Sequence, residues 1–146
     1  MKNQSIYLYI ELEGAKLELE PLHSLFAKCS CYGALAGDTY YTYEADGEKR
    51  AHKRTAAYFQ ARIEHNSGCD DSLNDVLLGF LNTYCYEGAP LRELIPNNNV
   101  KLWCSVSSDE PAIKMTIRQN TMRKLLELGL DVGITVVQNG RISART

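Results

Sequence analysis

Apolar and polar residues alternate with a period of two over residues 6–12 and 57–63, and this pattern predicts strands with one buried face. Residues 39–43, which are all tyrosine or threonine, favour a further strand. Asp46-Gly47 predicts a tight turn after it. We therefore expect a hairpin from this region into the 57–63 strand, with a charged segment at its mouth.

The last fifty residues carry the clearest pattern in the chain. Apolar positions alternate again over residues 100–106, 113–117 and 132–136. Asn120 is a candidate helix N-cap and Gly129 a candidate helix stop. This region predicts, in order, a strand, a tight turn, a second strand, a capped helix and a closing strand.

The strongest helix prediction covers residues 71–86, where Asp70 or Asp71 is a candidate cap and Gly88 and Pro90 mark the end. Its apolar stripe repeats at intervals of three and four residues: Leu73, Val76, Leu77, Phe80, Leu81 and Tyr84. A shorter helix is predicted from Glu20-Pro21, and one more turn over residues 91–95. Together these elements predict a single α+β domain, residues 1–146, with a mainly antiparallel sheet and two to three helices on one side of it.

Composition narrows the class of protein. A chain of 146 residues suits one domain with its own core, and a formal charge of −2 does not by itself predict a nucleic-acid or membrane partner. We find no signal-peptide pattern and no stretch near the ~18 apolar residues of a membrane span. Five cysteines, an odd number, are then expected to be free thiols in a reducing cytoplasm.

The sequence contains no motif typical of a metal, redox, phosphate-binding or nucleophilic site. His23, His52 and His65 have no partners at a metal-ligand spacing, and Cys29-Ser30-Cys31 is not a zinc or redox pair. No phosphate-binding glycine loop and no nucleophile elbow occurs. We therefore expect no catalytic residues, no metal, no cofactor and no enzymatic activity.

One charged run allows two interpretations. Lys49, Arg50, Lys53 and Arg54 lie within six residues, just after several tyrosines, and such a combination can bind phosphate and stack bases. The alternative is a solvated hairpin turn, which the net acidity of the chain favours.

A second candidate surface combines aromatic and acidic residues. Tyr7 and Tyr9 have the polar parity of the first strand, and Trp103 has the same parity in the 100–106 strand. If these strands are neighbours and no helix covers them, the three rings form a binding face; a second helical layer would instead bury them. The acidic candidates are Glu11, Glu13, Asp70 and Asp71, which either cap and solubilise the elements or face a basic partner.

Residues 100–137 resemble the end of a family of small, uncharacterised bacterial domains, in which a strand, a hairpin, a helix ending in L-x-x-L-G and a closing strand recur. Leu125 to Gly129, followed by the strand up to Val136, matches that motif, and the basic hairpin before Ala56 is similar in placement. The usual Pro-Thr after the first helix and the usual Trp near Tyr58 are absent. The resemblance implies an immunity protein that binds and neutralises a cognate bacterial toxin domain.

Two hypotheses follow from these patterns. The first is a non-catalytic protein-binding module, whose partner is a toxin domain and whose contacts are the aromatic and acidic residues named above. The alternative is a module that binds nucleic acid or a small ligand through the basic hairpin at residues 49–54.

Overall fold

The computed structural model describes residues 4–66, 72–109, 113 and 115–138. Its elements make an α+β fold, as predicted, with four α-helices in this part of the chain rather than two to three. In chain order they are β1 (Gln4–Gly14), α1 (Leu19–Leu25), β2 (Ser30–Ala34), β3 (Thr39–Tyr43), β4 (Lys49–Lys53), β5 (Ala57–Asn66), α2 (Ser72–Tyr84), α3 (Pro90–Leu94), the 3₁₀ turn η1 (Ile95–Asn97), β6 (Asn99–Ser108), α4 (Gln119–Leu128) and β7 (Asp131–Gln138).

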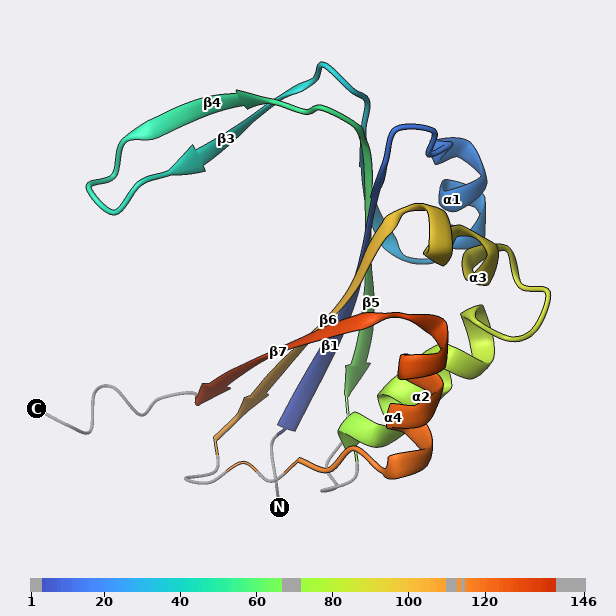
Figure 1. Ribbon diagram of the computed structural model, residues 1–146. Helices are drawn as coiled ribbons and strands as arrows, with labels where there is room; N and C mark the ends of the chain where they lie inside the picture. The colour runs from blue at the N-terminus through green and yellow to red at the C-terminus, as the bar shows by residue number, and fades with distance from the viewer. Residues whose placement is uncertain (1–3, 67–71, 110–112, 114, 139–146) are drawn as a thin grey trace, which may run out of the picture.

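Five strands form one sheet in the order β2-β5-β1-β6-β7. All neighbours are antiparallel except β6 and β7, which are parallel. The described helices all lie on one face of this sheet, while β3 and β4 form a separate ribbon that projects from its end on the other side (Figure 1). We call this β3–β4 ribbon the arm, and the helix-free side of the sheet the open face.

The period-two pattern of the sequence builds the core. Ile6, Leu8 and Ile10 of β1 point toward the helices and are fully buried, as are their counterparts on β5 and β6. The predicted 71–86 helix is confirmed as α2, whose buried residues pack over β1. None of the helices in the described ranges is long and apolar enough to cross a membrane.

The predicted hairpin at residues 113–117 is wrong. Ile113, Met115 and Ile117 do pack against the core, but the described part of this segment forms no strand. Helix α4, which follows this segment, supplies the crossover that the parallel pair of β6 and β7 needs. The alternation of apolar and polar residues in this segment reflects contact with the core and not strand pairing.

The predicted ends of α4 are half right. The N-cap is Arg118 and not Asn120, and its backbone N–H donates to the Asn74 side chain of α2 at 2.9 Å. Gly129 ends the helix as expected, in the left-handed conformation at φ 71°.

The charged run is not the mouth of a hairpin. Residues Lys49–Lys53 are themselves a strand, β4, which pairs with β3 across the predicted turn at Asp46-Gly47. The 57–63 strand, β5, pairs instead with β1 and β2 inside the main sheet.

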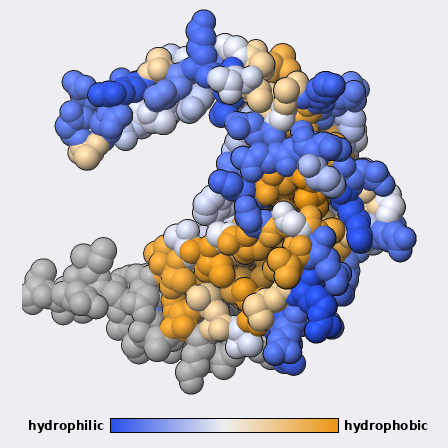
Figure 2. Space-filling model, viewed as in Figure 1, coloured by the Kyte–Doolittle hydropathy of each residue, from blue (hydrophilic) through white to orange (hydrophobic). Residues whose placement is uncertain are grey.

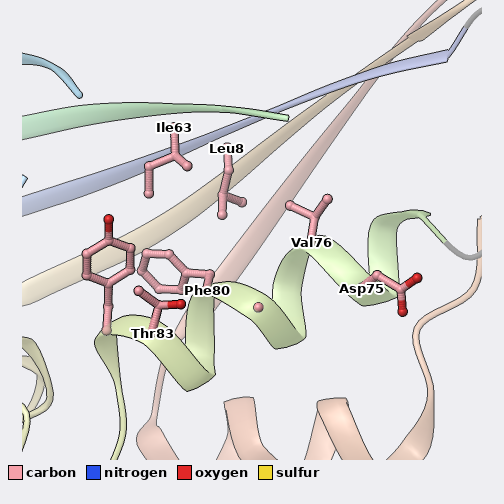
Figure 3. Close-up of a pocket in the computed structure, with 8 residues that line it drawn as sticks. Leu8, Ile63, Asp75, Val76, Phe80 and Thr83 are labelled. Carbon is pink, nitrogen blue, oxygen red and sulfur yellow. The ribbon is translucent and has the colours of Figure 1, made fainter. Parts of the chain in front are cut away.

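A hollow of about 270 Å³ lies between α2 and the sheet, where Leu8, Ile63, Val76 and Phe80 converge (Figure 3). Gly79 also lines it, in the interior of α2. A Cβ added at Gly79 would meet nothing within 4 Å apart from the helix's own backbone.

We expect Gly79→Ala to raise the free energy of unfolding by ~0.5–1 kcal/mol, because alanine loses less backbone entropy than glycine in a helix. Urea unfolding measures this change. Gly129→Ala is the matched control: it should lower stability by ~1–2 kcal/mol, because that position has a positive φ. Destabilisation by Gly79→Ala would show that α2 has no room at this position.

Candidate functional site

The open face is built from the polar-parity residues of three adjacent strands. The register places Tyr9 of β1 between Arg62 of β5 and Trp103 of β6. Glu11 lies in the same way between Gln60 and Lys101. No helix in the described ranges covers this face (Figure 1). Tyr7, Tyr9 and Trp103 therefore share a surface that no described helix buries.

Trp103 is the largest side chain of the open face and is 38% exposed. Its indole lies over Gly133, the residue opposite it on β7. A Cβ at Gly133 would overlap the indole ring, so the glycine is what lets the ring lie flat against the sheet.

Glu11 connects the three strands. Its Oε1 accepts a hydrogen bond from Trp103 Nε1, and its Oε2 accepts one from the Tyr58 hydroxyl at 2.5 Å. Both donors are diagonal neighbours, since Trp103 stands opposite Tyr9 and Tyr58 opposite Glu13. The carboxylate thereby holds two aromatic rings in place.

Tyr58 is the most strongly perturbed acid of this cluster. Burial raises the pKa of Tyr58, and the hydrogen bond and negative charge of Glu11 raise it further. The pKa of Tyr58 in the folded state exceeds its unfolded value of about 10. Tyr58 therefore contributes its full stabilisation below a pH of about 10, and this contribution is lost as the pH rises through the folded-state pKa.

Glu11→Gln is therefore expected to lower the Tyr58 pKa, since it removes the hydrogen-bonded carboxylate. Ultraviolet titration of tyrosine absorbance, with Tyr58→Phe to assign the transition, measures it. Glu13→Gln serves as the control and should shift the pKa less, because Glu13 makes the weaker electrostatic contribution to Tyr58. Equal shifts in the two variants would contradict a direct role for Glu11.

Arg62 and the two neighbouring tyrosines extend the aromatic surface. The Arg62 guanidinium lies 4.5 Å from the ring centroid of Tyr7 and 5.9 Å from that of Tyr9. Next to them a pocket of about 330 Å³ opens between Tyr9, Glu11, Trp103 and Thr135. The open face thus offers a recess lined by the rings of Tyr9 and Trp103 together with the carboxylate of Glu11.

A second cluster joins the arm to the sheet. Arg54 lies over the rings of Tyr58 at 4.1 Å and Tyr40 at 4.5 Å, and Tyr32 stands 5.9 Å away. Backbone hydrogen bonds between Gly37 and Arg54, and between Arg54 and Asp38, close the base of the arm. In the space-filling view, the arm and the sheet enclose a concave surface (Figure 2).

The cations of the arm do not form one patch. Strand alternation places Lys49 and Lys53 with Tyr41 and Tyr43 on one side of the ribbon, and Arg50 on the other. Lys49 lies over the Tyr41 ring at 4.1 Å, and Arg50 pairs with Glu44 at 3.3 Å. Residues 38–54 also contain four carboxylates against these four cations, namely Asp38, Glu44, Asp46 and Glu48.

Of the predicted partner-binding residues, the sheet brings together Tyr7, Tyr9, Glu11, Glu13 and Trp103. Asp70 and Asp71 lie outside the described residues. Tyr58, Arg62 and Gly133 belong to the site without having been predicted from the sequence. The first two have the polar parity of the 57–63 strand, and that parity was the available signal.

Within the described ranges, no group of three or more His, Cys, Asp or Glu side chains could hold a metal ion. Cys29, Cys31, Cys85 and Cys104 are free thiols. Burial raises the pKa of Cys104 to about 12 and that of Cys85 to about 11, so both thiols are protonated at neutral pH.

Comparisons of the chain with protein-family models, with curated proteins and with solved structures find no match.

Proposed function

We propose that this chain is a non-catalytic protein-binding module whose binding surface is the open face together with the arm. The observation that carries the proposal is the Tyr9–Trp103 pair, which lies uncovered on the sheet beside a recess. Tyr, Trp and Arg are the residue types that dominate binding energy at protein interfaces. Here Glu11 holds the rings of Trp103 and Tyr58 in place, and Gly133 lets the indole lie flat, so these two rings have little conformational entropy left to lose on binding.

The partner we propose is a toxin domain that this chain neutralises, as the sequence resemblance implies. The concave surface between the arm and the sheet suits a convex partner, because it offers contacts from two sides. Glu13 is an exposed carboxylate on this surface and would meet a basic group of the toxin. Glu11 accepts hydrogen bonds from Trp103 and Tyr58 and so orders two aromatic rings of this surface.

Co-expression tests the proposal. Cells that produce the toxin domain encoded beside this chain should survive when the chain is present and die when it is absent. A photo-crosslinking amino acid in place of Tyr7, on the open face, should then capture the toxin. The same amino acid in place of Tyr86, an exposed tyrosine just beyond α2, should not.

Failure to rescue, or capture from Tyr86 alone, would contradict the proposal. Retention of RNA that depends on Lys49 and Lys53 and falls steeply with salt would favour the nucleic-acid alternative instead.

A further inference from the structure

β7 is an edge strand of the five-stranded sheet. Within the described part of the chain β7 pairs with β6 alone, so the backbone N–H and C=O groups along its outer side have no strand partner. Exposed edges usually carry lysine, proline or a bulge that prevents pairing. Residues 132–137 carry no charged residue and no proline, and the edge is eight residues long. The opposite edge, β2, has only five residues and leads into the arm.

Apolar side chains surround this edge. Ile134 and Val136 have the parity of the helix side, yet they are 41% and 47% exposed, contrary to the buried face expected for this strand. Figure 2 shows hydrophobic residues gathered over β7. The face of the last strand that was predicted to be buried in the core is therefore exposed to solvent.

Helix α4 adds a second apolar strip. Met122 and Leu126 are one helical turn apart and exposed, and Leu126 is 81% exposed. Lys124 and Glu127 line a hollow shared with α2 and α3, so Met122 and Leu126 lie on the other flank of α4, away from α2. Because α2 packs over β1 and α4 connects β6 to β7, that flank is on the side of the free edge.

We propose that β7 pairs antiparallel with β7 of a second copy of this chain, which joins the two sheets into one continuous sheet. A two-fold axis makes a strand edge complementary to itself, and the uncharged segment 132–137 brings no like charges together. The same axis places the two α4 helices side by side on one face, with Met122 and Leu126 against their counterparts. These side chains supply apolar area beyond strand pairing, which a stable interface of ~1,200–2,000 Å² requires.

This arrangement does not depend on the proposed function. Both open faces would lie on the same side of the joined sheet, since the two-fold axis of an antiparallel pair runs perpendicular to the sheet. Each copy would keep its Tyr9–Trp103 surface uncovered.

Sedimentation of the purified full chain over a wide dilution series tests the proposal. The wild type should be a dimer that dissociates on dilution. Leu126→Glu should weaken the dimer by about tenfold or more, since two copies of the charge meet across the axis. Leu35→Glu is the matched control, a leucine that is 61% exposed next to β2, and should leave the dimer unchanged. Circular dichroism checks that both variants fold.

Hydrogen exchange identifies the surface that is used. The β7 amides that point away from β6 should exchange more slowly at high protein concentration, and Leu126→Glu should shift this slowing to concentrations about tenfold higher or more. A wild type that stays monomeric at every concentration overturns the proposal. So does a dimer whose β7 amides show no dependence on concentration, because it would use another surface.

Discussion

Replacing Phe59 by alanine is expected to lower the free energy of unfolding by ~3–5 kcal/mol, a large part of the total stability of a domain this size. Phe59 lies on β5, between β1 and β2, and is completely buried. Its ring centroid is 5.9 Å from that of Phe26 and 5.0 Å from that of His23, which it meets edge to face. Its removal leaves a cavity between the sheet and α1 that the strands cannot close, because β5 is paired on both sides.

Urea unfolding measures this loss, with two variants for comparison. Tyr43 is an exposed residue at the end of β3, so Tyr43→Ala should change the free energy of unfolding by less than about 0.5 kcal/mol. Phe80→Ala should cost less than Phe59→Ala, because Phe80 already borders the hollow beneath α2 and its neighbours can shift into that space (Figure 3). A loss under 1 kcal/mol for Phe59→Ala would show that β5 is not a central strand.

The core could be predicted from the sequence because burial and strand period are local properties. In β1, successive residues alternate between the helix side and the open face, so the pattern alone predicts Ile6 and Leu8 inward and Tyr7 and Tyr9 outward, as observed. The same parity places Trp103 outward. What the pattern does not contain is the pairing of β1 with β6, which joins residues 86 to 104 positions apart, from Glu13↔Asn99 to Gln4↔Ser108.

The errors also have physical causes. The alternation at Ile113, Met115 and Ile117 arises from contact with the core without a partner strand. The N-cap of α4 is Arg118, whose backbone N–H donates to the side chain of Asn74, 44 positions earlier in the sequence. Local rules favour Asn120, because a hydrogen bond to a distant helix leaves no pattern in the sequence near the start of α4.

The candidate site could be predicted in part for the same reason. Tyr58 and Arg62 join it because β5 is the other neighbour of β1, a pairing that the expected hairpin with residues 39–43 did not predict. Gly133 carries a function that composition does not reveal, since its importance is the space that it leaves for a ring on the next strand. A glycine within an alternating strand is itself a signal of such a close approach.

Trp103→Ala is expected to have the largest effect on binding to the partner, a loss of at least ~2 kcal/mol, or about 30-fold in affinity. The indole is the largest ring of the open face, and Glu11 and Gly133 fix its position. Gly133→Ala should reproduce much of this loss while Trp103 is still present, because the new Cβ would displace the ring from the sheet. Titration calorimetry with the proposed toxin partner measures both affinities.

Tyr86→Ala is the matched control, because it removes an exposed aromatic ring near the C-terminal end of α2, away from the open face, and should leave the affinity unchanged. The displacement of the ring has its own readout, since Trp103 is the single tryptophan of the chain and its fluorescence reports its surroundings. An altered spectrum with unchanged affinity in Gly133→Ala would mean that the partner does not contact the indole. Trp103 would then not be a binding residue, and the binding surface would have to be sought elsewhere on the molecule.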